Sequence, residues 1–320
     1  MVSGREENIA RIGACESGLT DRIEILDGAT GTLLERYGIR LRPPLWSASA
    51  IDKAPELLGR VHADYVAAGA TLITANTFRT NPRSVMAAGH SALRAASLTK
   101  QAVEIARTAI DAAEGEQATR LAASVAPVGD CYHPSESGSV LSLRADHEAH
   151  VENIVDAAVD VILVETMNGL DEAVLVASIV AETEHPFLVS LVTDTSGEAL
   201  LDGTPLSIAI RQIAAYRPEA ILTNCASPAA SVMAVQILAE ESKLAEAAWG
   251  VGSYPNSSAP DPVEGWARVS TVTDEAFDRS IAEMLRAGAG YVGSCCGTGP
   301  ETTERIVRMV RALAGETGSS

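Results

Sequence analysis

The stretch Ala289-Gly290-Tyr291-Val292-Gly293-Ser294-Cys295-Cys296-Gly297-Thr298-Gly299-Pro300-Glu301 leads from an apolar run into a charged, periodic segment. Residues 289–293 predict a buried strand, and the segment from Glu301 to about residue 314 predicts a helix. Pro300 suits a first helical turn, and Thr298 with Glu301 has the spacing of a capping box. The stretch therefore indicates a strand, a tight turn that carries two thiols, and a helix.

Cys295 and Cys296 lie close to the N-terminus of the predicted helix. That position lowers the pKa of a thiol and favours the thiolate, which is the form that binds metal. The alternative is that both are small residues packed at a strand end, because a free cysteine often behaves as a core hydrophobe. A third cysteine repeats the pattern, since residues 220–225 form an apolar run that ends in Cys225, and Ser227-Pro228 opens a helix from 229 to about 241.

Strand-like runs alternate with amphipathic stretches along the whole chain. The predicted strands are 23–27, 70–75, 121–125, 159–165, 186–192, 220–224, 248–252 and 289–294. The predicted helices between and after them include 55–68, 92–113, 146–158, 170–183, 206–216 and 274–287. Eight such alternations with near-continuously apolar strands predict a single-domain α/β fold, a (β/α)8 TIM barrel. A doubly wound open sheet is the alternative, weakened because no GxGxxG follows the first strand.

The composition excludes several classes of partner. The net charge is −18, from 24 Lys and Arg against 42 Asp and Glu, which argues against nucleic acid and anionic membranes. No run of apolar residues is long enough to span a membrane, and the first 22 residues lack an apolar signal core. Five cysteines without framework spacing fit a reducing cytoplasm, so we expect a cytoplasmic protein with small-molecule partners.

In a barrel, the chemistry lies at the carboxyl ends of the strands. Reading those ends in order gives Asp27-Gly28, Asn76-Thr77-Phe78, Val125-Ala126-Pro127, Glu165-Thr166, Asp194, Asn224-Cys225, Tyr254-Pro255-Asn256 and Cys295-Cys296. Three thiols that share one mouth and leave a fourth position open are typical of a catalytic zinc site. Cys15 and Cys131 lie in the tail and in a loop, and neither is interpreted as a ligand.

Four groups of residues carry a resemblance to a known family. They are Leu26-Asp27-Gly28-Ala29-Thr30-Gly31-Thr32; Pro44-Leu45-Trp46-Ser47 with His62-Ala63-Asp64-Tyr65 and Ala68-Gly69-Ala70; Thr223-Asn224-Cys225; and Gly293-Ser294-Cys295-Cys296-Gly297-Thr298. The sequence resembles the homocysteine S-methyltransferase family, whose zinc-binding barrel also forms one module of cobalamin-dependent methionine synthase. The match covers residues 23 to about 312. It departs at Ala29 and Ser294, where the family usually has Gly, and at Ala75, where it often has Thr.

The resemblance implies a site and an activity. One Zn(2+) per chain would be held by Cys225, Cys295 and Cys296. Homocysteine would be bound by Asp27 and Glu165, with the backbone around Gly28 at its carboxylate and no catalytic residue beyond the metal site. The expected substrate-binding set is Asp27, Gly28, Ala29, Asn76, Thr77, Glu165 and Asn224.

The resemblance favours S-methylmethionine or S-adenosylmethionine as the methyl donor, with methionine as the product. Leu45-Trp46-Ser47 and Tyr254-Pro255-Asn256 resemble the S-methylmethionine-dependent members, whereas the loop 129–135 differs from them. Two alternatives stay open: an inactive zinc-holding barrel with a storage or regulatory role, and a methyltransferase for another thiol or a selenol. The expected domain organisation is a flexible extension over 1–22, the barrel over 23–314 and a loose tail over 315–320. The sequence leaves the oligomeric state open.

Overall fold

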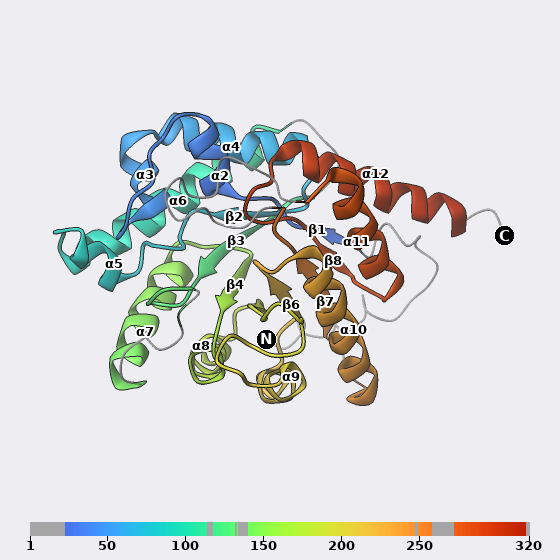
Figure 1. Cartoon of the computed structure of the whole chain (residues 1–320). Helices are drawn as coiled ribbons and strands as arrows, with labels where there is room; N and C mark the ends of the chain where they lie inside the picture. Colours follow the sequence, from blue (N-terminus) through green and yellow to red (C-terminus); the bar gives the residue numbers. More distant parts are fainter. Residues whose placement is uncertain are drawn as a thin grey trace, which may run out of the picture.

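The computed structural model of the chain describes residues 23–113, 118–131, 133, 140–246, 249–257 and 272–317. Eight parallel strands alternate with helices and close into a barrel, as Figure 1 shows. The predicted (β/α)8 TIM barrel is confirmed, and the open-sheet alternative is wrong. The predicted flexible extension 1–22, with Cys15, lies outside the described residues.

The strands form one ladder in the order β1-β8-β7-β6-β5-β4-β3-β2. Their bounds are β1 (Glu24–Ile25), β2 (Leu72–Ala75), β3 (Arg120–Val125), β4 (Val161–Met167), β5 (Phe187–Leu191), β6 (Ala220–Asn224), β7 (Gly250–Tyr254) and β8 (Tyr291–Val292). A parallel bridge between Leu26 and Leu72 joins the first strand to the second, and the backbone N–H of Asp27 donates to the carbonyl of Leu72 at 3.0 Å. These bonds close the ring, so no strand edge is left free along this join.

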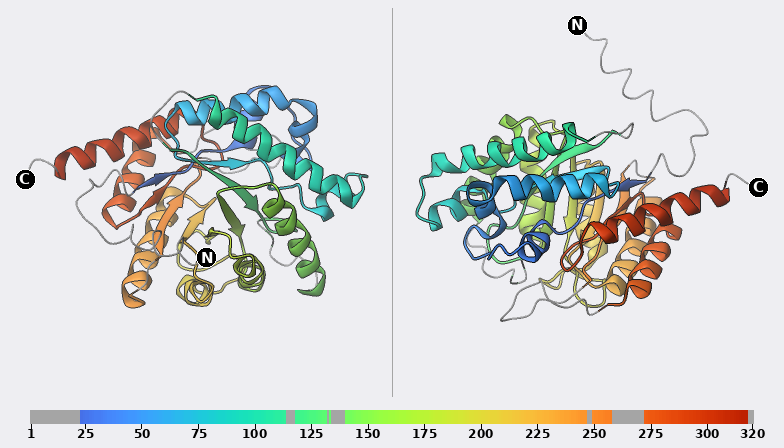
Figure 2. Two further views of the ribbon diagram at one scale, coloured as in Figure 1. Left: turned by 180° about the vertical axis from the view of Figure 1, so that it is seen from behind. Right: turned by 90° about the horizontal axis from the view of Figure 1, so that it is seen from above.

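The helices surround the strands on the outside of the barrel, as the views from behind and from above in Figure 2 show. Their bounds are α2 (Thr30–Arg36), α3 (Ser49–Lys53), α4 (Pro55–Ala67), α5 (Pro82–Ala87), α6 (Ala92–Asp111), α7 (Val140–Asp156), α8 (Leu170–Glu182), α9 (Leu206–Ala214), α10 (Pro228–Leu244), α11 (Asp274–Arg286) and α12 (Pro300–Thr317), with a short 3-10 helix, η3 (Trp46–Ala48). Ser227 caps α10 as the sequence predicts, because its hydroxyl accepts from the backbone N–H of Ala230 at 3.2 Å.

One local prediction at the last helix is wrong. The capping box is not formed, because the Thr298 hydroxyl donates to the Cys295 carbonyl and the Glu301 carboxylate accepts from Arg36 at 2.8 Å. The helix α12 ends at Thr317, and the loose tail over 315–320 stays a prediction, since 318–320 lie outside the described residues. Tertiary contacts at the turn therefore replace the local capping pattern.

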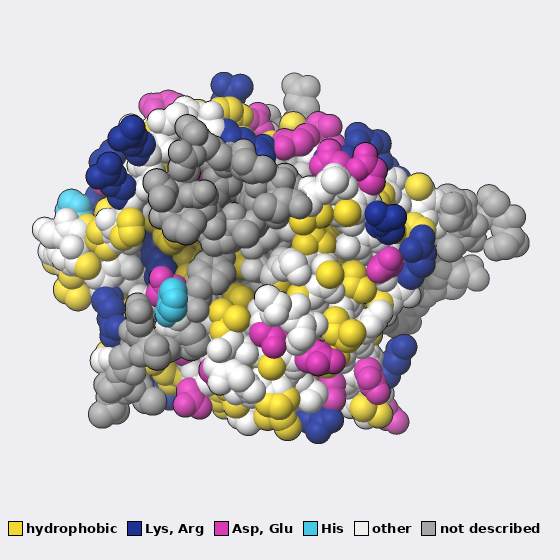
Figure 3. All heavy atoms as spheres, in the orientation of Figure 1, with side chains coloured by type: hydrophobic (Ala, Val, Ile, Leu, Met, Phe, Trp, Pro, Cys, Tyr) yellow, Lys and Arg dark blue, Asp and Glu magenta, His cyan; other side chains and the backbone are white. Residues whose placement is uncertain are grey.

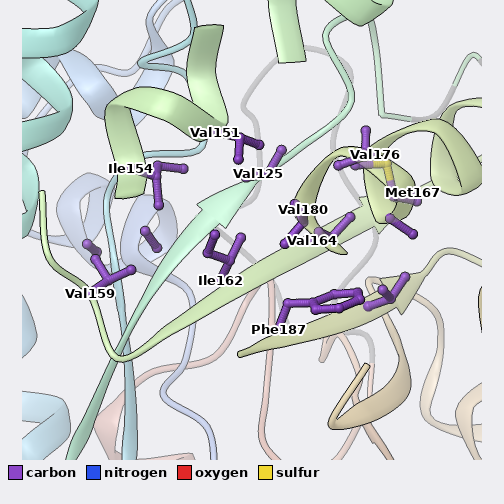
Figure 4. Packing of buried hydrophobic residues seen from close by; sticks show 14 of the residues in the cluster. Val125, Val151, Ile154, Val159, Ile162, Val164, Met167, Val176, Val180 and Phe187 are labelled. Carbon is purple, nitrogen blue, oxygen red and sulfur yellow. The ribbon is translucent and has the colours of Figure 1, made fainter. Parts of the chain in front are cut away.

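The core has an inner and an outer layer, built mainly from aliphatic residues. Inside the barrel, side chains such as Leu72, Leu163 and Leu222 pack against one another and are at most 1% exposed. Outside it, strand residues such as Ile162 and Val164 pack against the helices α7 and α8 (Figure 4). Alternate residues of a strand point to opposite faces, so a continuously apolar strand serves both layers.

A charged cluster lies at the amino ends of the strands, away from the predicted site. Arg120 donates to Glu24 at 3.1 Å and to Glu219 at 2.7 Å, and so links strands that are far apart in the sequence. Burial raises the pKa of Glu24, an effect that the neighbouring Arg120 opposes. The cluster joins the ends of three strand segments at this side of the barrel.

The visible surface carries acidic, basic and apolar side chains interspersed over the helices, as Figure 3 shows. Within the described part of the chain, no helix combines the length and the apolar character that crossing a membrane requires.

Candidate active site

A cavity of about 220 Å³ opens at the carboxyl ends of the strands. Its walls bring together most of the residues that the sequence singled out at the strand ends, including Asp27, Glu165 and Cys225. The lining residues at the strand ends and following loops include Asp27, Gly28, Ala29, Asn76, Glu165, Cys225, Cys295 and Cys296. The cavity therefore lies where a (β/α)8 barrel holds its chemistry.

Three thiols converge on one side of this cavity. Cys225 Sγ lies 2.9 Å from Cys295 Sγ, and Cys295 Sγ lies 3.9 Å from Cys296 Sγ. All three sulfur atoms lie within 4.8 Å of one another, and all three side chains are partly buried. Hydrogen bonds from Cys225 and Cys296 hold the pKa of Cys295 well below its usual range, and the contact with Cys295 raises the pKa of Cys225. Thiols this close cannot all ionise without a cation, so the cluster suits a thiophilic metal ion.

The loop after β7 fixes the two halves of the thiol cluster relative to each other. The Asn256 amide donates to the carbonyl of Cys225 at 3.0 Å. The backbone N–H of Cys295 donates to the carbonyl of Pro255 at 2.8 Å, and Ser257 N–H donates to the carbonyl of Cys296 at 3.0 Å. Cys225 itself has a φ of 54°, a left-handed conformation that a non-glycine residue rarely adopts without such support.

The cysteine turn is also held from the helix α2. The Thr32 hydroxyl accepts from the backbone N–H of Gly297 at 3.1 Å, and Arg36 donates to the carbonyl of Gly297 at 2.9 Å. Gly297 has a φ of 86°, a left-handed conformation that favours glycine, so this position of the turn serves backbone curvature.

Asp27 follows β1 and is 6% exposed. Its Oδ2 accepts from the backbone N–H of Thr74 at 2.9 Å, a bond that fixes the carboxylate at the cavity wall. Burial raises the pKa of Asp27 to about 8, against the lowering effect of the Thr74 hydrogen bonds, and the nearby Glu165 contributes in the same upward direction. A carboxyl with a raised pKa is stabilised in its charged form when a cation binds beside it.

Glu165 lies where β4 departs from regular pairing. The register between β4 and β5 shifts between Val164 and Met167, and Thr166 has a φ of 61°. The Glu165 carboxylate accepts from the Ser124 hydroxyl at 2.5 Å and from the Tyr254 hydroxyl at 3.1 Å. Burial raises the pKa of Glu165 to about 7, despite these two donors. The irregularity re-aims the side chain toward the cavity, as bulges beside active sites often do.

Asn224 supports this irregular end of β4 instead of lining the cavity. It is fully buried, its Oδ1 accepts from Thr166 N–H at 3.2 Å, and its Nδ2 donates to the Thr166 hydroxyl at 2.9 Å. It also forms a hydrogen bond that lowers the pKa of Cys295 after the larger effects of the neighbouring thiols. The structure therefore places Asn224 behind the wall, next to a metal-ligand candidate.

Thr77 is likewise buried behind the wall, because its hydroxyl donates to the carbonyl of Ser124 at 2.9 Å and accepts from Ser124 N–H at 2.8 Å. Asn76 does line the cavity, and its amide exchanges hydrogen bonds with the hydroxyl and the carbonyl of Ser47 at 2.7 and 2.8 Å. Of this pair, Asn76 alone has a side chain at the cavity, so substrate binding by Thr77 stays an untested prediction.

The residues that depart from the family pattern fit their positions without strain. Ala29 has a φ of −68°, so no left-handed conformation demands glycine there. Gly28 is required by packing, since a Cβ would lie 2.7 Å from the hydroxyl of Tyr65. Ser294 is buried, and its hydroxyl accepts from Thr298 at 3.0 Å. Ala75 contributes a methyl group to the cavity wall, and the hydroxyl of the neighbouring Thr74 forms a hydrogen bond with Asp27.

Two residues of the cavity, Ser124 and Arg79, were not singled out in the sequence. Ser124 orients Glu165 together with Tyr254, and a serine inside an apolar strand is the one signal that could have found it. A second group lines the part of the cavity nearest β2 and β3, namely Trp46, Phe78, Arg79, Asp130 and Cys131. Cys131 is 6% exposed and burial raises its pKa to about 12; it is separate from the three-thiol cluster. Of the loop 129–135, which differs from the S-methylmethionine-dependent members, Tyr132 and residues 134–135 lie outside the described residues.

The fold and the site together define a barrel enzyme with a cluster of three thiols at its mouth. A family model described as homocysteine S-methyltransferase matches residues 24–310, and the chain belongs to this family. The homocysteine S-methyltransferase of Escherichia coli is 31% identical over 87% of this chain and 92% of its own length. The homocysteine S-methyltransferase YbgG of Bacillus subtilis is 28% identical over 90% of this chain and 95% of its own.

A solved relative shows the same architecture. The crystal structure of the homocysteine methyltransferase MmuM from Escherichia coli, in its metallated form, superposes with a TM-score of 0.77 and 29% identity. The superposition covers 89% of this chain and 95% of that protein. The barrel fold is therefore shared with a homocysteine methyltransferase whose metallated form has been crystallised.

The buried Asp27 predicts a pH dependence of stability in the metal-free protein. Its pKa is near 3.8 when unfolded and about 8 when folded, so the folded state holds a proton that the unfolded state releases. The stabilisation is complete below about pH 4 and is lost as the pH rises toward about 8. Asp27→Asn should therefore flatten the fall in unfolding free energy between about pH 5 and 8 by up to about 1.4 kcal/mol per pH unit.

Urea denaturation at several pH values measures this slope. Asp111→Asn, at an exposed position at the end of α6, is the matched control and should leave the slope unchanged. An Asp27→Asn variant with the same pH dependence as the wild type would show that the carboxyl is ionised in the folded protein.

Proposed function

We propose that the protein is a zinc-dependent methyltransferase that moves a methyl group from a positively charged sulfonium to the thiol of homocysteine, giving methionine. The observation that carries the proposal is one cavity with three thiols and two carboxylates in its wall, the buried Asp27 and the partly buried Glu165. Membership of the homocysteine S-methyltransferase family supports the same reaction.

The thiol cluster fits one zinc ion. The cluster offers three sulfur ligands, one fewer than the four that close a structural zinc site. The fourth position would be left for a substrate, as in a catalytic zinc site. When bound there, zinc would act as a Lewis acid that favours the thiolate of a fourth sulfur near neutral pH. The contacts of Asn256 and Ser257 with the cysteine backbone hold the ligands in place for it.

The two carboxylates provide the binding site for the ammonium group of homocysteine. Both have raised pKa values, about 8 for Asp27 and about 7 for Glu165, because burial disfavours their charges. An ammonium group between them would restore the ionised forms and would neutralise the buried charge. Ser124 and Tyr254 keep Glu165 in one orientation, so the amino acid is held by its ammonium while its sulfur reaches the cysteines.

The charge of the cavity favours a cationic donor. Among the described residues, its lining includes the acidic residues Asp27, Glu35, Asp130 and Glu165 and one basic residue, Arg79. Such a wall attracts a sulfonium such as S-methylmethionine or S-adenosylmethionine, and disfavours a polyanionic donor such as methyltetrahydrofolate. Trp46 and Phe78 add aromatic faces, which interact favourably with a cationic centre.

The reaction balances as a single displacement. The homocysteine thiol releases its proton to solvent, and the sulfur forms a bond to the methyl carbon. The bond from that carbon to the donor sulfur breaks, and its electron pair stays on the donor, which becomes a neutral thioether. Opposite charges disappear as the transition state forms, so the apolar surroundings of the cavity favour the step over the same reaction in water.

The donor assignment is tested with the zinc-loaded protein and homocysteine. S-methylmethionine, S-adenosylmethionine, betaine and methyltetrahydrofolate are supplied in parallel, and methionine is measured. We expect turnover with one of the two sulfoniums, and rates at least about tenfold lower with the other two donors. Turnover with methyltetrahydrofolate alone would refute the charge argument. Zinc binding without turnover on any donor would favour the alternative of a non-catalytic zinc-holding barrel.

The metal assignment predicts about one zinc per chain in protein purified under reducing conditions. Cys225→Ser should lose most of this metal, because one of the three sulfur ligands is removed. Cys131→Ser is the matched control, since this buried thiol is outside the cluster, and it should retain the metal. Elemental analysis measures both, and full zinc content in Cys295→Ser and Cys296→Ser would rule out the site.

The acceptor assignment predicts a separate effect for Glu165→Gln. The KM for homocysteine should rise by about 10- to 100-fold, because a charged hydrogen bond to the ammonium is lost, while zinc stays bound. Glu148→Gln, at an exposed position on α7, should leave both quantities unchanged. Steady-state kinetics and elemental analysis check the pair. Loss of zinc with an unaltered KM would assign Glu165 to the metal site instead.

A further inference from the structure

One part of the cavity is left unassigned when homocysteine is placed at the thiols and the carboxylates. It is lined by Phe78, Arg79, Asp130 and Cys131, which follow the carboxyl ends of β2 and β3, and by Trp46 of η3. In the closed strand order, β2 and β3 lie across the barrel from β7, whose neighbours β6 and β8 lead into the cysteines. This part of the cavity therefore faces the thiol cluster across the mouth.

The direction of the proposed displacement gives this part of the cavity a role. Two sulfur atoms exchange a methyl group along one line, so the donor sulfur must lie on the opposite side of the methyl carbon from the attacking sulfur. With homocysteine sulfur at the cysteines, the donor is placed against the β2 and β3 side. The loop of residues 127–131 that follows β3 supplies Asp130 and Cys131 to this side, and we call it the donor wall.

The donor wall is held by a guanidinium from the preceding strand end. Arg79 Nη1 donates to the carbonyls of Pro127 and Val128 at 2.9 and 3.4 Å. Its Nη2 donates to the carbonyl of Gly129 at 3.1 Å and to Cys131 Sγ at 3.4 Å. Arg79 is only 7% exposed, so its buried guanidinium donates to four acceptors that all belong to one loop.

Two further side chains complete the support of the donor wall. Glu172 Oε1, on α8, accepts from the backbone N–H of Val128 at 3.0 Å, and it lies 2.9 Å from Nε2 of the buried His147. Asn168 donates to the carbonyl of Asp130 at 2.8 Å. These backbone groups of the wall thus bond to side chains of neighbouring elements, and Arg79 satisfies the largest share of them.

We propose that Arg79 is a positioning residue that fixes the donor wall and thereby sets the KM for the methyl donor. The inference rests on the proposed function for the identity of the ligand, and on the contacts of Arg79 for the wall itself. Its planar fork places two nitrogens, each with two protons, against acceptors spread over residues 127–131. A lysine carries the same charge on one nitrogen and cannot reach the same set of acceptors.

Kinetics with variants of Arg79 test the role in donor binding. In Arg79→Met and in Arg79→Lys, the KM for the sulfonium donor should rise at least about tenfold, while zinc content and the KM for homocysteine change less than about twofold. Arg94→Met, which removes a partly exposed guanidinium on α6 paired with Asp52, is the matched control and should match the wild type. Restoration of the wild-type donor KM by Arg79→Lys would overturn the proposal, because charge alone would then suffice.

A second measurement tests the wall without any turnover. In zinc-loaded protein with Cys15→Ser, Cys131 is the one thiol outside the metal cluster, and its burial protects it from iodoacetamide. Arg79→Met should speed alkylation of Cys131 at least about tenfold, as read by mass spectrometry, with little change for Arg94→Met. An unchanged alkylation rate of Cys131 would show that Arg79 does not hold the donor wall. An equal rise in the KM for the donor and in the KM for homocysteine would show that the effect is not specific to the donor. Either result overturns the proposal. If the wild type transfers a methyl group from none of the donors, the proposed function is overturned instead. The alkylation experiment still tests the support of the donor wall, because it needs no turnover.

Discussion

The closing hydrogen bonds between the first two strands are the constraint on which the rest of the molecule depends. Asp27 N–H and the carbonyl of Leu72 join the ends of a ladder whose eight strands all run in one direction. Once that ring is closed, every strand ends at the same mouth, whatever its place in the sequence. Cys225 and Cys295 are 70 residues apart in the chain, yet their sulfur atoms lie 2.9 Å apart.

The mouth gathers groups that an apolar core disfavours. Asp27 is buried and Glu165 is partly buried, and both carboxyls have raised pKa values. The neighbouring thiols form hydrogen bonds with one another. The surrounding structure tolerates them because specific donors, such as Thr74, Ser124 and Tyr254, are fixed around each carboxylate. Left-handed backbone at Thr166 and Cys225 adds strain at the same place. Strain and desolvation concentrated at one mouth are typical of a site that is completed by a ligand or a metal.

The sequence identified those site residues that have a reactive or charged side chain and also stand at the end of an apolar strand. Thiols and carboxylates at the ends of apolar runs are visible in one dimension, so Asp27, Glu165 and the three cysteines were all expected at the mouth and all line the cavity. The sequence did not separate side chains that reach the cavity from those that support its wall. Thr77 and Asn224 follow strands as Asn76 and Cys225 do, but their hydrogen bonds are made behind the wall. That choice depends on strand twist and on the irregular pairing at β4, which no local pattern encodes.

The sequence by itself determined the barrel, the identity of the metal-ligand candidates and the side of the barrel on which they lie. These follow from the period of apolar residues and from the rule that parallel strands end together, both of which are local or topological. Only the tertiary structure decided that Arg79 holds the loop after β3, that Asn256 ties Cys225 to the cysteine turn, and that Arg36 displaces the capping box at Glu301. These are contacts between residues distant in the chain. Their geometry is set by how the loops pack at the mouth, because a side chain can satisfy a distant backbone group only after the barrel has closed.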